Sequence, residues 1–149
     1  MARTYRNGPE EKKVVDTLRL SDAEWYECVS EMDRESARNC QDHTRRARER
    51  LPYRNLHHVL ITVRNYCGRL QYFQSRPYDL SESGIGFLHG AYMHVGTSIE
   101  LQLMHRVTGM TKVRATVRGC SHIKNKIHCV GAQFDELIEL DDYLLAQAG

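Results

Sequence analysis

The sequence predicts a mainly β protein, a small antiparallel barrel of six strands with one helix before it and one after it. Short runs in which apolar and polar residues alternate recur from residue 56 onward, separated by turn residues. About six such strands favour a barrel, because closing a sheet removes its exposed edges. Two other stretches, near residues 22–38 and 135–147, carry apolar residues at helical spacing instead.

A capping box begins the first predicted helix. Ser21 is followed three residues later by Glu24, so each side chain can bond the backbone N–H of the other residue. One face of the helix is then apolar, with Trp25, Cys28, Val29 and Met32. We expect this stripe to cover the chain's own core, and the alternative is a dimer or partner contact centred on Trp25. Residues 1–20 are mostly polar and are expected to form a mobile tail or a short docking segment.

Residues 40–54 form an arginine-rich linker that contains Arg45, Arg46, Arg48, Arg50 and Arg54. Pro52 ends any helix in this stretch and favours extended backbone at the residue before it. We therefore expect two parts: residues 1–40 with the tail and helix, and residues 41–149 with the linker, the barrel and the C-terminal helix. The planar fork of arginine suits bidentate contact with phosphate or a guanine edge, whereas a solvated charged linker is the alternative.

The predicted barrel strands are residues 56–64, 69–74, 85–89, 99–104, 112–118 and 127–134. The tripeptide Ser75-Arg76-Pro77 is expected to end the second of them, because proline cannot donate a ladder hydrogen bond. The final helix is expected over residues 135–147. Asp135 and Glu136 would stand at its N-terminus, where carboxylates are favourable.

Composition limits the classes of function. At 149 residues, with 41% hydrophobic and 27% charged residues, the chain can bury one modest core. No apolar run approaches the roughly 18 residues that span a bilayer, so no membrane insertion is expected. The first residues lack the apolar centre of a secretory signal, which predicts a cytoplasmic location. The net charge of +2 is too small to indicate binding of a nucleic acid polymer, so an anionic partner must meet a local arginine cluster.

The sequence offers weak candidates for metal or nucleophilic chemistry. The five cysteines are odd in number and irregularly spaced, which argues against a disulfide framework. Cys120, His122 and His128 could share one face of a hairpin, but no paired ligand spacing accompanies them, so no metal site is predicted. Cys67 and Cys129 lack a recognisable orienting group for nucleophilic catalysis. We therefore predict that the protein is not an enzyme.

Two polar motifs and the strand pattern between them resemble the PilZ domain family over about residues 41–149. The first is the RxxxR pattern from Arg46 to Arg50, just before the first barrel strand. The second is the D/NxSxxG pattern Asp79-Leu80-Ser81-Glu82-Ser83-Gly84, two strands later. The run Val130-Gly131-Ala132-Gln133-Phe134, followed by an acidic and apolar helix, is similar to the end of a PilZ barrel.

The resemblance implies a receptor for the bacterial second messenger cyclic di-GMP. Its implied ligand-binding residues are Arg45, Arg46, Arg50, Asp79, Ser81 and Gly84. Arg46 and Arg50 would contact the guanines and phosphates, and Asp79 would accept hydrogen bonds from guanine N–H groups. Ser81 would bond the ligand, and Gly84 would keep the turn open beside it. Arg45 is similar to an arginine that in some members favours a stacked pair of ligands.

The implied mode of action is a change in conformation or partner interaction when cyclic di-GMP binds. No cofactor besides this ligand is expected. A downstream protein partner is expected, and a homodimer is a possible assembly. The alternative is an adaptor of PilZ fold that does not bind the nucleotide. Binding of single-stranded nucleic acid ranks last, because the tyrosines and phenylalanines do not form an evident stacking platform.

Overall fold

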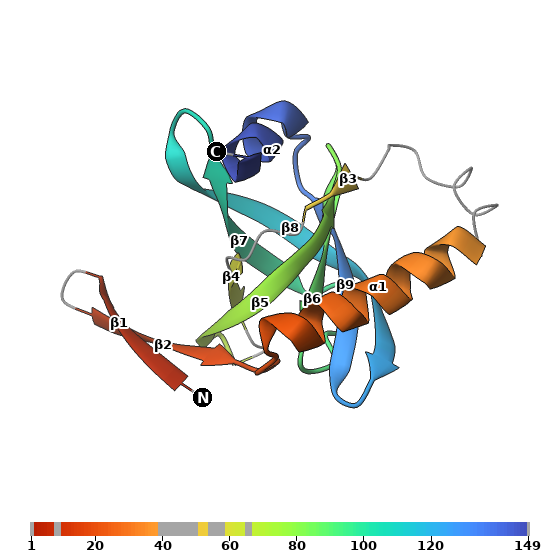
Figure 1. The fold of residues 1–149 in the computed structure, drawn as a ribbon. Coiled ribbons are helices and arrows are strands. Elements are labelled where there is room, and N and C mark those ends of the chain that lie inside the picture. Colours follow the sequence, from red (N-terminus) through yellow and green to blue (C-terminus); the bar gives the residue numbers. More distant parts are fainter. Residues whose placement is uncertain (1, 8–9, 39–50, 54–58, 65–66, 149) are drawn as a thin grey trace.

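The computed structural model describes residues 2–7, 10–38, 51–53, 59–64 and 67–148 (Figure 1). Its elements are β1 (Ala2–Asn7), β2 (Glu10–Asp16), α1 (Asp22–Arg38), β3 (Leu51–Pro52), β4 (Val59–Arg64), β5 (Leu70–Leu80), β6 (Gly84–His89), β7 (Ser98–His105), β8 (Gly109–Lys124), β9 (Ile127–Phe134) and α2 (Leu140–Ala148). Among these helices, neither is both long and apolar enough to cross a membrane.

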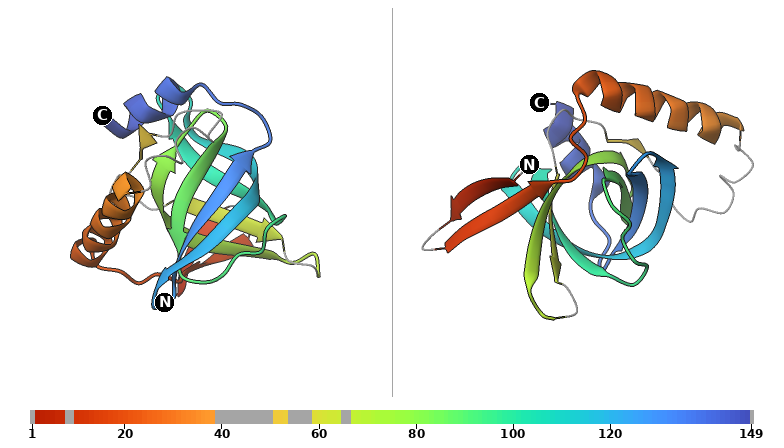
Figure 2. Two further views of the ribbon diagram at one scale, coloured as in Figure 1. Left: turned by 90° about the vertical axis from the view of Figure 1, so that its right-hand side faces the viewer. Right: turned by 90° about the horizontal axis from the view of Figure 1, so that it is seen from below.

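Six strands close into an antiparallel barrel, which confirms the predicted fold class (Figures 1 and 2). Around the barrel they follow the order β5, β4, β7, β8, β9 and β6, and the pairing of β6 with β5 closes the ring. Each strand therefore finds a neighbour on both sides over part of its length.

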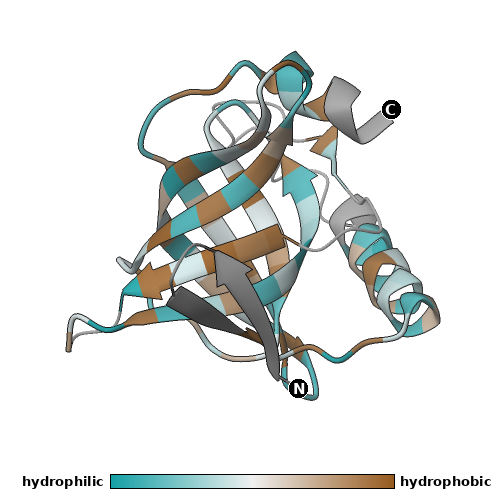
Figure 3. Cartoon of the chain, turned by 90° about the vertical axis from the view of Figure 1, so that its left-hand side faces the viewer, coloured by the Kyte–Doolittle hydropathy of each residue, from teal (hydrophilic) through white to brown (hydrophobic). Residues whose placement is uncertain are grey.

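Apolar residues fill the barrel because its strands alternate. Val59, Ile61 and Val63 of β4 are buried, and the residues between them are only half-buried. Strand β7 alternates in the same way, whereas every residue of β6 is buried (Figure 3). Tyr143 of α2 joins this core, so the C-terminal helix closes one end of the barrel (Figure 1).

The N-terminal segment forms two strands where the sequence suggested a tail or docking segment. β1 and β2 make an antiparallel hairpin, and residues 14–16 of β2 pair in parallel with residues 72–74 of β5. The long strand β5 explains this pairing: its second half meets β6, which leaves an edge of its first half for β2. Just beyond β2, Gly90 N–H donates to Thr17 Oγ1 at 2.9 Å, a second link to the barrel.

The predicted helix α1 and its capping box are both confirmed. Ser21 N–H donates to Glu24 Oε1 at 3.1 Å, and Glu24 N–H donates to Ser21 Oγ at 3.2 Å. Trp25 is fully buried, and the apolar stripe packs with Tyr78 and Leu88 against the outside of the barrel (Figure 2). The stripe therefore covers the chain's own domain, as expected.

The predicted strand end at Ser75-Arg76-Pro77 is wrong, because β5 continues through these residues to Leu80. At this point the strand changes its neighbours. Ser75 is the last residue paired with β4, and Arg76 is the first paired with β6. The register shifts between Pro77 and Asp79, and a strand proline is tolerated at such a bulge.

The last helix starts later than predicted, at Leu140, so Asp135 and Glu136 do not begin it. The preceding residues make backbone hydrogen bonds to other parts of the chain. Asp135 N–H donates to Arg114 O at 3.0 Å, and Ile138 N–H donates to Glu82 O at 2.9 Å. These bonds hold the segment against the barrel, so it does not form the first turn of the helix.

Candidate functional site

The turn between β5 and β6 is held by the side chain of Ser81. Its Oγ accepts hydrogen bonds from Gly84 N at 3.1 Å and from Ser83 N at 3.3 Å. The backbone adds a bond from Ser81 N to Gly84 O at 2.9 Å. Ser81 is 2% exposed, so the structure shows it supporting the turn from inside.

Gly84 lies tightly against strand β9. A Cβ at this position would stand 2.5 Å from the carbonyl oxygen of Ala132, closer than atoms of this kind approach. Glycine is therefore required by packing alone, whether or not a ligand is present. The role suggested by the sequence, clearance for a ligand, stays a prediction.

The same turn anchors the chain that leads to α2. Phe134 N–H donates to Ser83 O at 2.7 Å, and Ile138 N–H donates to Glu82 O. The carbonyl groups of Ser83 and Glu82 thus hydrogen-bond to the segment before α2, and these bonds make the turn rigid.

Asp79 is half-buried and lies where three strands meet. Its Cα pairs with Pro52 of β3 on one side and with Gly86 of β6 on the other. The bulge just before it changes the register, and bulges redirect the side chains that follow. Strands on both sides therefore fix the backbone of Asp79.

Arg45, Arg46 and Arg50 lie outside the described residues. The short strand β3, which follows Arg50 directly in the sequence, pairs with the end of β5, Leu51 opposite Leu80 (Figure 1). Tyr53 N–H extends this contact by donating to Tyr78 O at 3.0 Å. The structure thus brings the chain that follows the first motif next to the second motif.

Helix α1 contacts the strand that carries the second motif through two polar residues that the sequence did not single out. Tyr78 OH donates to Asp33 Oδ1 at 2.8 Å. Arg76 Nη2 donates to Asp22 Oδ1 at 2.8 Å, and its guanidinium carbon lies 5.2 Å from the centre of the Trp25 ring. No local pattern marks these pairs, since 45 and 54 residues separate their members.

A family model described as the PilZ domain matches residues 44–147. The chain belongs to the PilZ domain family. This confirms the resemblance found in the motifs and covers nearly the same residues.

Several solved structures are similar to the chain at low sequence identity. The PilZ domain of YcgR from Escherichia coli, with c-di-GMP, is 18% identical with a TM-score of 0.48, over 70% of this chain and 88% of that one. The K. pneumonia MrkH–c-di-GMP complex is 17% identical with a TM-score of 0.47, over 69% of this chain and 49% of that one. MotI/DgrA of Bacillus subtilis is 19% identical with a TM-score of 0.46, over 70% of this chain and 48% of that one. The chain spans about half the length of MrkH and MotI. A comparison with curated proteins gives no match.

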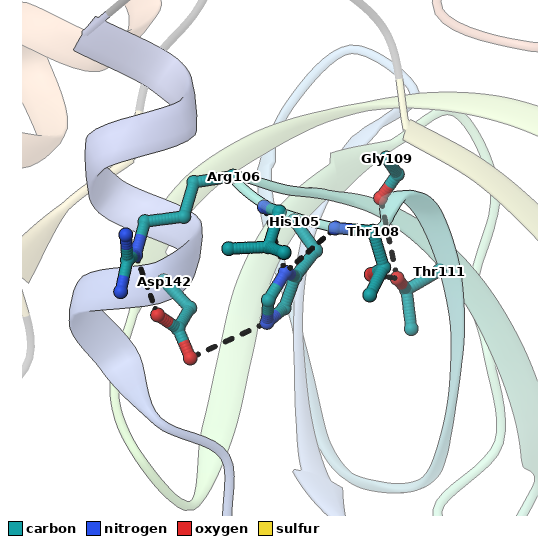
Figure 4. Close-up of polar contacts among 7 residues, drawn as sticks. His105, Arg106, Thr108, Gly109, Thr111 and Asp142 are labelled. Carbon is teal, nitrogen blue, oxygen red and sulfur yellow. Dashed lines mark hydrogen bonds and ion pairs between the residues drawn. The ribbon is translucent and has the colours of Figure 1, made fainter.

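A second polar cluster joins α2 to the β7–β8 hairpin of this PilZ domain (Figure 4). Arg106 Nε donates to Asp142 Oδ1 at 2.7 Å, and His105 Nε2 lies 3.3 Å from Asp142 Oδ2. The hydrogen bond from Arg106 holds the pKa of the Asp142 carboxyl below its usual value. His105 Nδ1 accepts the backbone N–H of Val107 at 3.1 Å. The cluster fixes α2 over the barrel end, beside a hollow of about 600 Å³.

His89, His128 and His122 are register neighbours on strands β6, β9 and β8. Ser75 Oγ lies 2.8 Å from His89 Nδ1, and burial lowers the pKa of His89 to about 4, so the imidazole is neutral at pH 7. His122 and His128 are cross-strand partners with ring centres 5.2 Å apart. Within the described ranges, no group of three or more His, Cys, Asp or Glu side chains is arranged to hold a metal ion.

Proposed function

We propose that the protein is a receptor for cyclic di-GMP, bound between the arginine linker and the β5–β6 turn. The proposed ligand residues are Arg45, Arg46, Arg50, Asp79, Ser81 and Gly84. Binding would change the conformation of the linker or the interaction with a downstream protein. A second messenger acts inside the cell, so the proposed receptor works in the cytoplasm.

The chemistry of the nucleotide matches these side chains. Cyclic di-GMP presents two guanines, with O6 and N7 acceptors and N–H donors, and two negatively charged phosphodiesters. Arginine can bond the acceptor edge, stack on the base and pair with phosphate, and a carboxylate can accept the guanine N–H groups. Within this proposal Asp79 makes the direct contact from the turn, and Ser81 contributes mainly by holding the turn in shape.

The pairing of β3 with β5 carries the proposal. Leu51 pairs with Leu80, which stands between Asp79 and Ser81 in the second motif. Arg50 is joined to Leu51 by one peptide bond, and consecutive Cα atoms are about 3.8 Å apart. This short connection supports a site in which both motifs act on one ligand. A rigid turn and a linker that closes over the ligand would then form the two halves of a switch.

Calorimetry with cyclic di-GMP, and with GMP as the comparison ligand, tests the proposal. The wild-type protein should bind cyclic di-GMP selectively, and Arg46→Ala or Arg50→Ala should abolish the binding heat. Arg48→Ala is the matched control, because it removes the same charge from the same linker but lies between the motif positions. Absence of both heat and a thermal shift for the wild type at high ligand concentration would favour the non-binding adaptor instead.

A further inference from the structure

We infer that helix α1 is a positioning element of the nucleotide site and that it acts through the hydrogen bond between Asp33 and Tyr78. The inference rests on the proposed function, because the site in question is the one for cyclic di-GMP. It assigns a role in ligand affinity to a helix that lies outside the residues matched by the PilZ family model.

Tyr78 connects the helix to both sides of the site. Its hydroxyl donates to Asp33 at 2.8 Å, and its backbone carbonyl accepts the N–H of Tyr53, the residue that follows β3. Its neighbour in the chain is Asp79, the proposed ligand carboxylate. The Tyr78 side chain is 8% exposed and packs in the apolar cluster beneath α1. A displacement of Tyr78 would therefore reach β3 through its backbone carbonyl and Asp79 through the chain.

The helix has other anchors, so the Asp33 contact can be removed without releasing it. Trp25 and Cys28 are fully buried, and Arg76 holds the N-terminal end through Asp22. This interface is nevertheless imperfect. Among the residues that the structure describes, the buried donors Trp25 Nε1 and Arg76 Nη1 have no hydrogen-bond partner. Since unpaired buried donors weaken docking, the bond from Tyr78 to Asp33 gains in importance.

The negative charge of α1 has the opposite effect on ligand affinity from the positioning role of Asp33, so removing Asp33 distinguishes the two. Helix α1 carries six acidic and two basic residues, a formal net charge of −4. Cyclic di-GMP carries two negative charges, so an acidic helix beside the site repels it. If Asp33 influenced binding only by its charge, then its removal would tighten binding. If Asp33 positions Tyr78, then its removal weakens binding.

The experiment is calorimetry of cyclic di-GMP binding to Asp33→Ala, with Glu27→Ala as the matched control. Both changes remove one negative charge from α1, but Glu27 is exposed on the solvent side of the helix. We expect Asp33→Ala to raise the Kd about tenfold, within the usual range of coupling between two sites. Glu27→Ala should stay within about twofold of the wild type. Asp33→Asn keeps an acceptor for the Tyr78 hydroxyl and should restore most of the affinity.

A second readout follows the helix itself. Cys28 is fully buried and burial raises the pKa of its thiol, so alkylation requires an opening of α1. Coupling is reciprocal, so cyclic di-GMP should slow Cys28 alkylation about tenfold in the wild type. The nucleotide should have no such effect in Asp33→Ala. Peptide mass spectrometry separates Cys28 from the exposed Cys67, whose labelling rate should stay constant.

The outcomes separate the two proposals. A wild type that does not bind cyclic di-GMP overturns the proposed function and this inference with it. A wild type that binds, with Asp33→Ala binding equally well or better, overturns the inference alone. If Asp33→Ala melts far below the wild type, Tyr78→Phe replaces it, since that change keeps the ring and removes only the hydroxyl. Unchanged affinity in Tyr78→Phe would then be the overturning result.

Discussion

The barrel interior and the interface beneath α1 are both apolar clusters, but they are built differently. The interior consists of strand residues that face inward by alternation, such as Ile61 and Leu101, both completely buried. The α1 interface is organised around a buried arginine and a tyrosine hydroxyl, Arg76 and Tyr78. From this contrast we expect the interior to determine whether the chain folds, and the α1 interface to adjust the proposed nucleotide site.

Truncating the interior should have the largest effect. Leu101→Ala in β7 should lower the free energy of unfolding by about 3–4 kcal/mol, because it removes buried methyl groups and leaves a cavity. Met104→Ala is the control on the same strand, and its 44% exposed side chain should make the change smaller than about 0.5 kcal/mol. Chemical denaturation measures both. Similar losses in the two variants would contradict the assignment of the interior as the element that determines folding.

The Ser75–His89 pair is the polar exception near the barrel interior, and it predicts a dependence on pH. Burial lowers the pKa of His89 to about 4, compared with 6.5 in the unfolded chain. The unfolded state therefore binds more protons between these values, so the stability present above pH 6.5 is lost as the pH falls toward 4. The loss should approach about 3 kcal/mol. His89 meets Ser75, Phe73, Phe87 and His128 on the packed side.

Denaturation at a series of pH values tests this dependence. His89→Asn cannot take up the proton, so its stability should vary less between pH 6.5 and 4 than that of the wild type. His94→Asn, at an exposed position, should keep the wild-type dependence. A His89→Asn profile parallel to that of the wild type would mean that other groups cause the acid sensitivity.

At the α1 interface the effects should be smaller and local. Ser21→Ala removes the capping hydroxyl that accepts Glu24 N–H, and such a loss costs about 1 kcal/mol. We expect faster Cys28 alkylation by roughly fivefold, with little change in the denaturation midpoint of the barrel. Ser30→Ala, on the exposed side of the same helix, is the control. If Ser21→Ala lowered the denaturation midpoint of the barrel as far as Leu101→Ala does, the proposed distinction between the two clusters would be wrong.

The features that the sequence predicted correctly are those with a local cause. Alternation in β4 and the capping box at Ser21 each involve residues a few positions apart, so the pattern alone reveals them. The motif from Asp79 to Gly84 was also recognisable, although its Ser81 proved to bond the turn itself. The direct ligand contacts of Arg46 and Arg50 remain predictions, because both residues lie outside the described ranges.

The features that the sequence missed depend on tertiary neighbours. Proline at position 77 normally indicates a strand end, but here β5 passes from β4 to β6 and a bulge accommodates the ring. The bond between Tyr78 and Asp33 joins residues 45 positions apart, and no periodicity marks such a pair. Helix α2 begins five residues later than predicted, because Asp135 and Ile138 donate their backbone N–H groups to Arg114 and Glu82.

Replacing the buried arginine should have the smallest effect on stability. Arg76→Met removes a desolvated charge whose Nη1 has no hydrogen-bond partner among the described residues, while its partner Asp22 is 64% exposed and can be solvated. Asp22 stays solvated when Arg76 is replaced, so no buried charge is left unpaired, and exchanging buried charge for apolar packing is then often neutral or stabilising. We therefore expect a change within about 1 kcal/mol by chemical denaturation. Arg118→Met, at an exposed position on β8, controls for the lost charge. A loss as large as that of Leu101→Ala would show that the interface, like the interior, determines folding.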